Sequence, residues 1–156
     1  MSNLTSGDDL IGFDGADEIL REWGSGLTPD PDLTGWQCAD RHRMLSSRAS
    51  AEPGRYRTSR APYLREIMDA LSPSHPAQRV VFIKGAQVGA TEAGNNWIGF
   101  VIHHAPGPML AVQPNVELAK RNSRQRIDPL IEDSPELRTR VKPSRSPDAG
   151  NTMLSK

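Results

Sequence analysis

Helical spacing of apolar residues marks the middle of the chain. Between Pro62 and the break at Ser72 and Pro73, four apolar residues recur at i, i+3, i+4 and i+7, namely Leu64, Ile67, Met68 and Leu71. Ser59 is a candidate N-cap for this segment, and proline is favoured in a first helical turn. The spacing therefore predicts an amphipathic helix over residues 62–71.

Two short, continuous apolar runs follow, at 79–83 and 109–112. Runs of this length that end at Gly or Pro are typical of strands buried on both faces of a parallel sheet. Residues 91–104 lie between them and are long enough for a helix, and Asn115 is a candidate cap for another over 116–128. The order strand, helix, strand predicts an α/β fold with a parallel βαβ core and flanking helices.

The front of the chain differs in composition from the rest. Residues 1–33 are rich in Gly, Asp, Ser and Pro, and only 9–23 can form a helix. We therefore expect an acidic, loosely ordered N-terminal arm over 1–33, followed by a body over 34–156 that opens with a short helix near 36–45.

Charge follows the same division. Nineteen basic and nineteen acidic residues cancel in total, but residues 1–40 hold nine of the acids and only one base, Arg21. One interpretation is a basic body that binds polyanions, and the other is a set of solvated surfaces. Charge by itself supports both equally.

Composition excludes several classes of protein. Thirteen Gly and thirteen Pro exclude a long coiled coil. No apolar run approaches the roughly 20 residues of a membrane-spanning helix, and the first ten residues lack the pattern of a signal peptide. The single cysteine, Cys38, cannot form an internal disulfide or a zinc cage and is expected to pack. We therefore expect a cytoplasmic protein without a membrane segment.

The candidate chemistry lies in residues 84–91, Lys-Gly-Ala-Gln-Val-Gly-Ala-Thr, between a predicted strand and a predicted helix. Glycines let backbone N–H groups converge on a phosphate, a helix start adds partial positive charge, and a first-turn hydroxyl can hold Mg²⁺. On the pattern G-x-x-x-x-G-K-[ST], Gly89 and Thr91 match, whereas Ala90 replaces the lysine and Lys84 the first glycine. The pattern by itself favours an ordinary strand-to-helix turn, although a lysine at the first position can reach the same oxygens.

The run 80–91 resembles the deviant P-loop of tailed-phage terminase large subunits of the lambda-type, GpA-like branch, in which the lysine opens the loop. The resemblance covers residues 36–156. Its upstream matches are Trp36, 39–41, 54–58, 62–63 and 67–69, and its downstream matches are 91–92, 95–96, Pro108, 113–115, 123–124, 126–127, Pro129 and Leu137. Residues 34–156 thus look like the N-terminal part of a terminase ATPase domain.

This resemblance implies a partial P-loop NTPase from the ATP-driven motor that packages viral DNA of a bacteriophage or prophage. It implies that Thr91 ligates Mg²⁺, that Tyr63 contacts adenine, and that the ATP phosphates are bound by Lys84, Gly85, Ala86, Gln87, Val88, Gly89 and Ala90. Relatives often carry glutamine after the aromatic residue, where this chain has Leu64. Tyr63 as a core aromatic therefore stays open as an alternative.

The partners that the resemblance implies are double-stranded viral DNA, the terminase small subunit and the portal of the procapsid, in the host-cell cytoplasm. It leaves open whether the chain forms a homo-oligomer. A basic stretch could follow DNA phosphates or remain a solvated surface in which Arg124 bridges Asp128, and it comprises Lys120, Arg121, Arg124 and Arg126. Gln113 and Asn115 are second-rank ligand candidates at the end of a predicted strand.

An ATPase of this kind also needs a Walker B strand that ends in Asp-Glu, and its nuclease carboxylates would lie further on. The adjacent Glu132 and Asp133 follow a predicted helix and not an apolar strand. We therefore expect a fragment, truncated before the Walker B strand, that binds ATP but hydrolyses it inefficiently by itself, and we assign no catalytic residue. The alternatives are a non-enzymatic DNA- or partner-binding module and an inactive remnant.

Overall fold

The computed structural model describes residues 14–28, 31–48, 50–142 and 152–156. It divides the chain into two compact units, Met1–Asp32 and Leu33–Lys156. Of the described residues, 52% are helical and 3% lie in strands.

The first unit contains one described helix, α1 (Ala16–Leu27), which overlaps the only stretch of the arm that the sequence predicts to be helical. Asp17 and Glu18 lie in its first turn, where carboxylates interact favourably with the helix dipole. Its apolar side chains form a stripe that stays half or more exposed, at Ile19, Leu20, Trp23 and Leu27.

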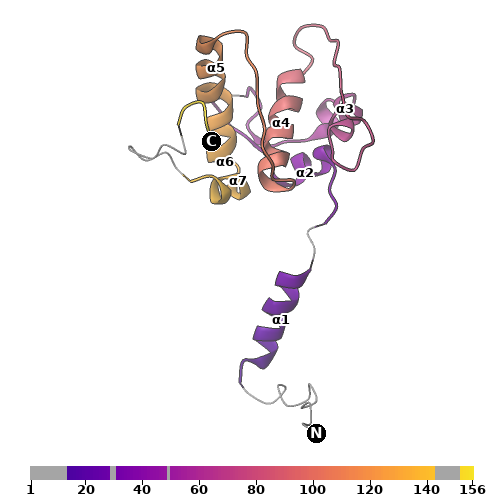
Figure 1. The fold of residues 1–156 in the computed structure, drawn as a ribbon, viewed down its shortest axis with the longest axis vertical. Coiled ribbons are helices and arrows are strands. Elements are labelled where there is room, and N and C mark those ends of the chain that lie inside the picture. Colours follow the sequence, from indigo (N-terminus) through magenta and orange to yellow (C-terminus); the bar gives the residue numbers. More distant parts are fainter. Residues whose placement is uncertain (1–13, 29–30, 49, 143–151) are drawn as a thin grey trace. The chain divides into compact units, whose positions relative to one another are not determined.

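The second unit is built from short helices and one hairpin (Figure 1). In chain order these are α2 (Gly35–His42), β1 (Met44–Leu45), β2 (Gly54–Arg55), the 3₁₀ turn η2 (Thr58–Arg60), α3 (Leu64–Ala70), α4 (Ala90–His103), α5 (Val116–Asn122), the π-helix η3 (Ser123–Ile127), α6 (Asp128–Asp133) and α7 (Pro135–Arg140). Strands β1 and β2 pair antiparallel, with Met44 opposite Arg55.

Helix α4 lies at the centre of this unit and contacts α2, α3, α6 and α7. On the side of α2 and α3 the core consists of Ala39, Tyr56, Leu64, Met68 and Ala93. On the side of α6 and α7, a carbon added at Gly99 would stand 3.5 Å from Leu137 and 3.6 Å from Leu130. Position 99 of α4 therefore faces both helices, with room for a methyl group in ordinary van der Waals contact.

Most predicted helices form, with shifted ends. The apolar stripe of residues 62–71 becomes α3, but Tyr63 occupies the N-cap position while Ser59 lies in the preceding 3₁₀ turn. Asn115 caps α5 as expected, because its side chain accepts a hydrogen bond from the Leu118 N–H at 2.9 Å. The predicted helix 116–128 is interrupted by the π-helical turn η3.

The predicted α/β fold is wrong for this structure. The described residues contain only the antiparallel hairpin, and no parallel βαβ sheet of the P-loop NTPase kind. Residues 80–84 and 106–113 carry no strand assignment, although α4 lies between them as predicted. Their apolar side chains are 75–92% exposed at Val81, Ile83, Leu110 and Val112.

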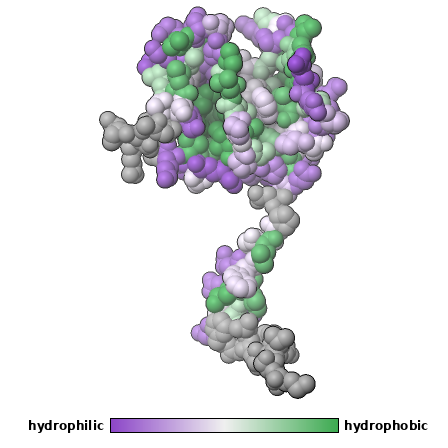
Figure 2. Space-filling model, viewed as in Figure 1, coloured by the Kyte–Doolittle hydropathy of each residue, from purple (hydrophilic) through white to green (hydrophobic). Residues whose placement is uncertain are grey.

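The reason for this difference is that a strand is defined by partners and not by its own residues. The sequence pattern measures the tendency of a segment to be buried, whereas a parallel ladder needs hydrogen-bonding neighbours on its edges. No described residue supplies such a neighbour to either run. Figure 2 shows hydrophobic residues on the face where the segment after α4 runs up to α5.

Two glycines provide a matched test of the packing between α2 and α3. A carbon added at Gly35 would stand 2.8 Å from the Met68 carbonyl oxygen, whereas one added at Gly94, inside α4, would meet nothing within 4 Å. We expect Gly35→Ala to destabilise the protein by about 1–3 kcal/mol, because a backbone must move. Gly94→Ala should stabilise it by about 0.5–1 kcal/mol through helix propensity. Urea unfolding followed by circular dichroism measures both, and equal stability of Gly35→Ala and the parent would contradict the packing.

Candidate functional site

Residues 84–89 form an exposed turn that leads into α4. The turn contains two residues with left-handed backbone, Gln87 at φ 58° and Gly89 at φ 76°, and Gly89 is the N-cap residue of α4. Gly89 also lies against α3, since an added carbon there would stand 3.0 Å from Leu64 Cδ1. Both the backbone conformation and the space therefore favour glycine at this position.

The start of α4 presents donors to the turn. The first N–H groups of a helix have no partner within the helix, and the aligned peptide dipoles give this end a partial positive charge. In α4, the first residues are Ala90 and Thr91, and Thr91 is exposed. Backbone donors and a hydroxyl thus lie together at the end of the turn, an arrangement that accommodates an anion.

Lys84 brings a cation to the other end of the turn. Its side chain is exposed, and Nζ donates a hydrogen bond to the Gly85 carbonyl at 3.4 Å. The ammonium group therefore folds back onto the turn that it opens. Gly85, Ala86 and Gln87 are exposed, and Val88 to Ala90 are half-buried.

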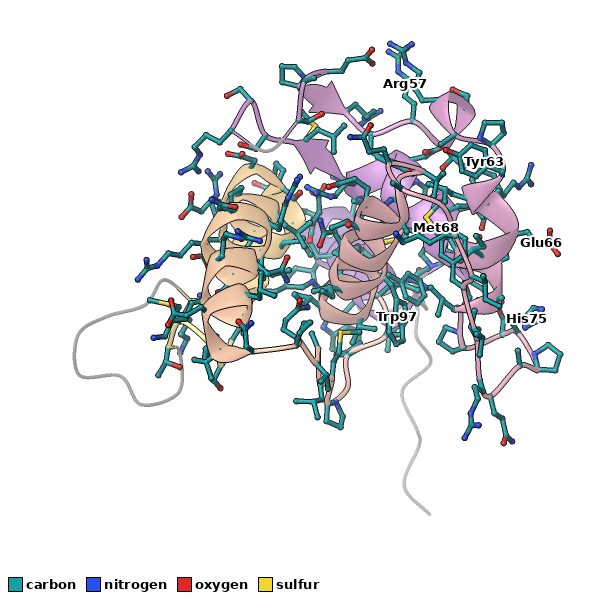
Figure 3. All side chains as sticks on the ribbon, turned by 90° about the horizontal axis from the view of Figure 1, so that it is seen from above. Arg57, Tyr63, Glu66, Met68, His75 and Trp97 are labelled. Atoms are coloured by element: carbon teal, nitrogen blue, oxygen red, sulfur yellow. The ribbon has the colours of Figure 1, made fainter. Side chains whose placement is uncertain are left out.

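Tyr63 joins the same site from α3. Its hydroxyl donates a hydrogen bond to the Val88 carbonyl at 3.2 Å, and the residue is 58% exposed. Figure 3 shows Tyr63 at the edge of the molecule. The exposure rules out the alternative in which Tyr63 is a core aromatic. The structure thus brings every predicted site residue, 84–91 and Tyr63, to one surface.

Glu92, which the sequence reasoning did not single out, anchors the start of α4. Its two carboxylate oxygens lie 3.3 Å from Arg43 Nη2 and 3.3 Å from Arg126 Nη1. Asn95 Nδ2 donates to the same carboxylate at 3.2 Å, and Arg43 also donates to the Met44 carbonyl. Glu92 therefore connects the first turn of α4 to the end of α2 and to the π-helix.

The burial of Arg43 makes its ion pair with Glu92 important for the fold. Arg43 is only 6% exposed. Burial lowers the pKa of the Arg43 guanidinium, and the neighbouring Glu92 carboxylate opposes that shift. A buried guanidinium without its carboxylate is strongly unfavourable. Glu92 is thus required by the fold beside the turn.

The other candidates divide between structural and surface positions. Asn115 caps α5. Asp128 pairs with Lys156 at 2.7 Å and not with Arg124, the alternative partner that the sequence spacing offers. Lys120 pairs with Glu117 at 3.2 Å, while Arg124 is exposed. Gln113 lines an apolar cavity of about 500 Å³ between the segment 106–113, α4, α5 and the C-terminal residues.

A second group of titratable side chains lies away from the turn, where α2, α4 and α7 meet. Cys38 Sγ lies 4.0 Å from His103 Nδ1, and His42 Nδ1 lies 3.2 Å from Glu136. The rings of His42 and His103 have their centroids 4.5 Å apart and are tilted by 35°. Burial, with the negative charge of Glu136, raises the pKa of the Cys38 thiol to about 11. Among the described residues, no group of three or more such side chains has the geometry to hold a metal ion.

Comparison with known proteins places this geometry in context. Residues 50–156 match the family model of the phage terminase large subunit gpA, ATPase domain. The matched region includes the hairpin strand β2, Tyr63, the turn and Glu92. No curated protein and no solved structure matches the chain. Within the described ranges, no helix is long and apolar enough to cross a membrane.

The Cys38 environment predicts a specific pH profile of alkylation. An unfolded thiol ionises near pH ~8.5, so its rate with iodoacetamide should level off above about pH 9. In the native protein the rate should stay low at pH 8 and keep rising toward pH 11, because burial raises the thiol pKa. Over this window the native state holds a proton that the unfolded state has lost, so stability falls as pH rises. Native and guanidinium-unfolded protein with the same profile would contradict the burial of Cys38.

Proposed function

The chain belongs to the family of the phage terminase large subunit gpA through its ATPase domain, and on that premise we propose that the turn 84–91 binds the phosphates of ATP. Membership confirms the family resemblance predicted from the sequence. It implies nucleotide binding and a DNA-packaging context for this region. Which residues bind the nucleotide is our proposal.

One observation carries the proposal: Lys84 and Thr91 are both exposed and lie at the two ends of the turn that leads into α4. Backbone N–H groups at the helix start suit the phosphate oxygens, and the ammonium group neutralises charge that the amides cannot. The fixed lysine of the usual pattern is replaced by Ala90. Lys84 supplies the missing charge from the opposite end.

The donors present also suit a magnesium ion beside the phosphates. Thr91 offers an exposed hydroxyl oxygen in the first turn of α4, the position from which a P-loop hydroxyl reaches the metal. Mg²⁺, when bound, neutralises charge on the phosphate oxygens. Thr91 is our candidate ligand, while Glu92 beside it is committed to Arg43 and Arg126 and holds the turn in place.

Tyr63 is our candidate for the adenine contact. An exposed aromatic ring held beside the turn by its hydrogen bond to Val88 can stack on a flat base.

Family membership further supports three partners as proposals, namely duplex viral DNA, the terminase small subunit and the procapsid portal. These are proposed partners of the whole packaging motor, which acts on DNA, and family membership assigns no single residue of this chain to them.

The first test concerns the ammonium group. Lys84→Ala should weaken ATP binding by about tenfold to a hundredfold, since a hydrogen bond to a charged group contributes roughly 1.5–3 kcal/mol. Isothermal titration of the full chain with Mg-ATP measures the affinity. Arg79→Ala is the matched control, because it removes one exposed positive charge five residues upstream. Equal affinity of Lys84→Ala and the parent would refute phosphate binding by Lys84, as would an equal loss in Arg79→Ala.

The second test separates the base from the phosphates. Tyr63→Ala should weaken ATP but leave tripolyphosphate binding unchanged, whereas Lys84→Ala should weaken both. Tyr63→Phe keeps the ring but loses the bond to Val88 that holds it beside the turn, so its ATP affinity should lie between those of Tyr63→Ala and the parent. Competition titrations with the two ligands give this comparison. A Tyr63→Ala variant that binds ATP normally would remove the adenine contact and leave the phosphate proposal standing.

A further inference from the structure

A strongly basic segment runs from the end of α2 through the hairpin to the start of α3. Residues 41–65 contain seven arginines and a single acid, Glu52. Three of these arginines are neutralised within the fold: Arg43 by Glu92, Arg48 by Glu132 at 2.5 Å, and Arg60 by Glu52 at 2.5 Å. Arg55 and Arg57 make no ion pair with a described residue, so their charge faces solvent.

Arg55 and Arg57 point outward from the same edge of an extended segment. Along residues 55–58 exposure alternates, with Arg55 and Arg57 exposed and Tyr56 and Thr58 buried. Two residues of extended chain span about 6.6 Å, so the two guanidinium groups leave the backbone on one side at that interval. Figure 3 shows Arg57 projecting outward at the edge of the molecule.

The backbone under these arginines is fixed from the inside. Tyr56 packs in the core, and its N–H donates to the Arg43 carbonyl at 3.0 Å, which continues the hairpin ladder. The Thr58 N–H and hydroxyl both donate to Asp40 Oδ1, at 2.6 and 2.7 Å. A segment held at alternate residues presents its outward side chains with little freedom of the backbone.

The same arginines line a hollow in the surface. An open hollow of about 740 Å³ lies over the hairpin, and Arg55, Arg57 and Arg60 contribute to its wall with Ser50 and Tyr56. Glu52 is the only acidic residue in that wall and is paired with Arg60. No residue of the turn 84–91 lines it. The hollow is therefore a separate, anion-accepting surface.

We propose that this hollow binds the phosphate backbone of double-stranded DNA. Arginine forms bidentate hydrogen bonds with phosphate, and backbone contacts position a protein on DNA without reading its sequence. The identification of the ligand as DNA rests on the proposed function, whereas the charge and the geometry of the hollow are independent of it.

A row of outward arginines favours a polymer over a single nucleotide. A nucleotide site is a concave pocket that surrounds one polyphosphate and one base. This hollow is open, and its arginines follow an extended chain. Binding through it should be independent of DNA sequence and should fall steeply with salt, as the release of counterions requires.

The test is anisotropy titration of the full chain with a labelled duplex of arbitrary sequence, repeated at several salt concentrations. Arg55→Ala/Arg57→Ala should weaken duplex binding by about tenfold at low salt and make the slope of log K against log salt shallower by about two. ATP affinity should not change in this variant. Lys84→Ala should show the reverse, so failure of this proposal is distinguishable from failure of the nucleotide site.

Two matched variants complete the test. Arg138→Ala/Arg140→Ala removes the same charge from exposed positions on α7 and should bind duplex as the parent does. Arg121→Ala/Arg124→Ala examines the other basic stretch. The proposal is overturned if the parent does not bind duplex, if the hairpin variant keeps the parent's affinity and salt slope, if the loss follows Arg121 and Arg124 instead, or if free ATP displaces the duplex from the parent. Circular dichroism establishes that each variant is folded.

Discussion

The close approach of α3 to the beginning of α4 is the contact on which the rest depends. Leu64 is almost fully buried, and its Cδ1 would stand 3.0 Å from any carbon added at Gly89. Burying such a side chain contributes roughly 1.5–3 kcal/mol, so the contact fixes where α4 begins. Because Tyr63 directly precedes Leu64, the same contact brings its hydroxyl to the Val88 carbonyl. One apolar interaction thus positions the backbone donors, the aromatic ring and the end of the turn.

Glu92 adds a polar constraint to that apolar one. Ion pairs of this kind are weak evidence for stability, since desolvation offsets their attraction. Their geometric consequence is firmer. A carboxylate held between Arg43 and Arg126 allows one rotation of α4 about its axis, and that rotation decides which way Thr91 faces. Exposed Thr91 and the ion pairs of Glu92, of which Arg43 is the buried partner, therefore share one helix start.

The sequence predicted the elements whose information is local. Helix α3, α4, the Asn115 cap and the turn between 84 and 90 all depend on residues within a few positions of one another. The runs at 79–83 and 109–112 were predicted as strands and are not paired, because pairing depends on distant segments that no local pattern records. The Glu92 network was missed for the same reason, since its arginine partners lie 49 and 34 residues away. The local sequence around Glu92 shows only an acidic residue in the first turn of a predicted helix. The favourable interaction with the helix dipole explains that position without any arginine partner.

The π-helix Ser123–Ile127 has a consequence for the rod of helix that runs from α5 through α6. Its hydrogen bonds reach one residue further than those of an α-helix, so the segment carries one residue more than an uninterrupted helix of the same length needs. One residue corresponds to about 100° of helical rotation. The stripe of side chains on α5 is therefore out of phase with the stripe on α6. The one extra residue thus rotates the side chains of α6 relative to those of α5. Its deletion would remove that rotation and turn the two helices relative to each other.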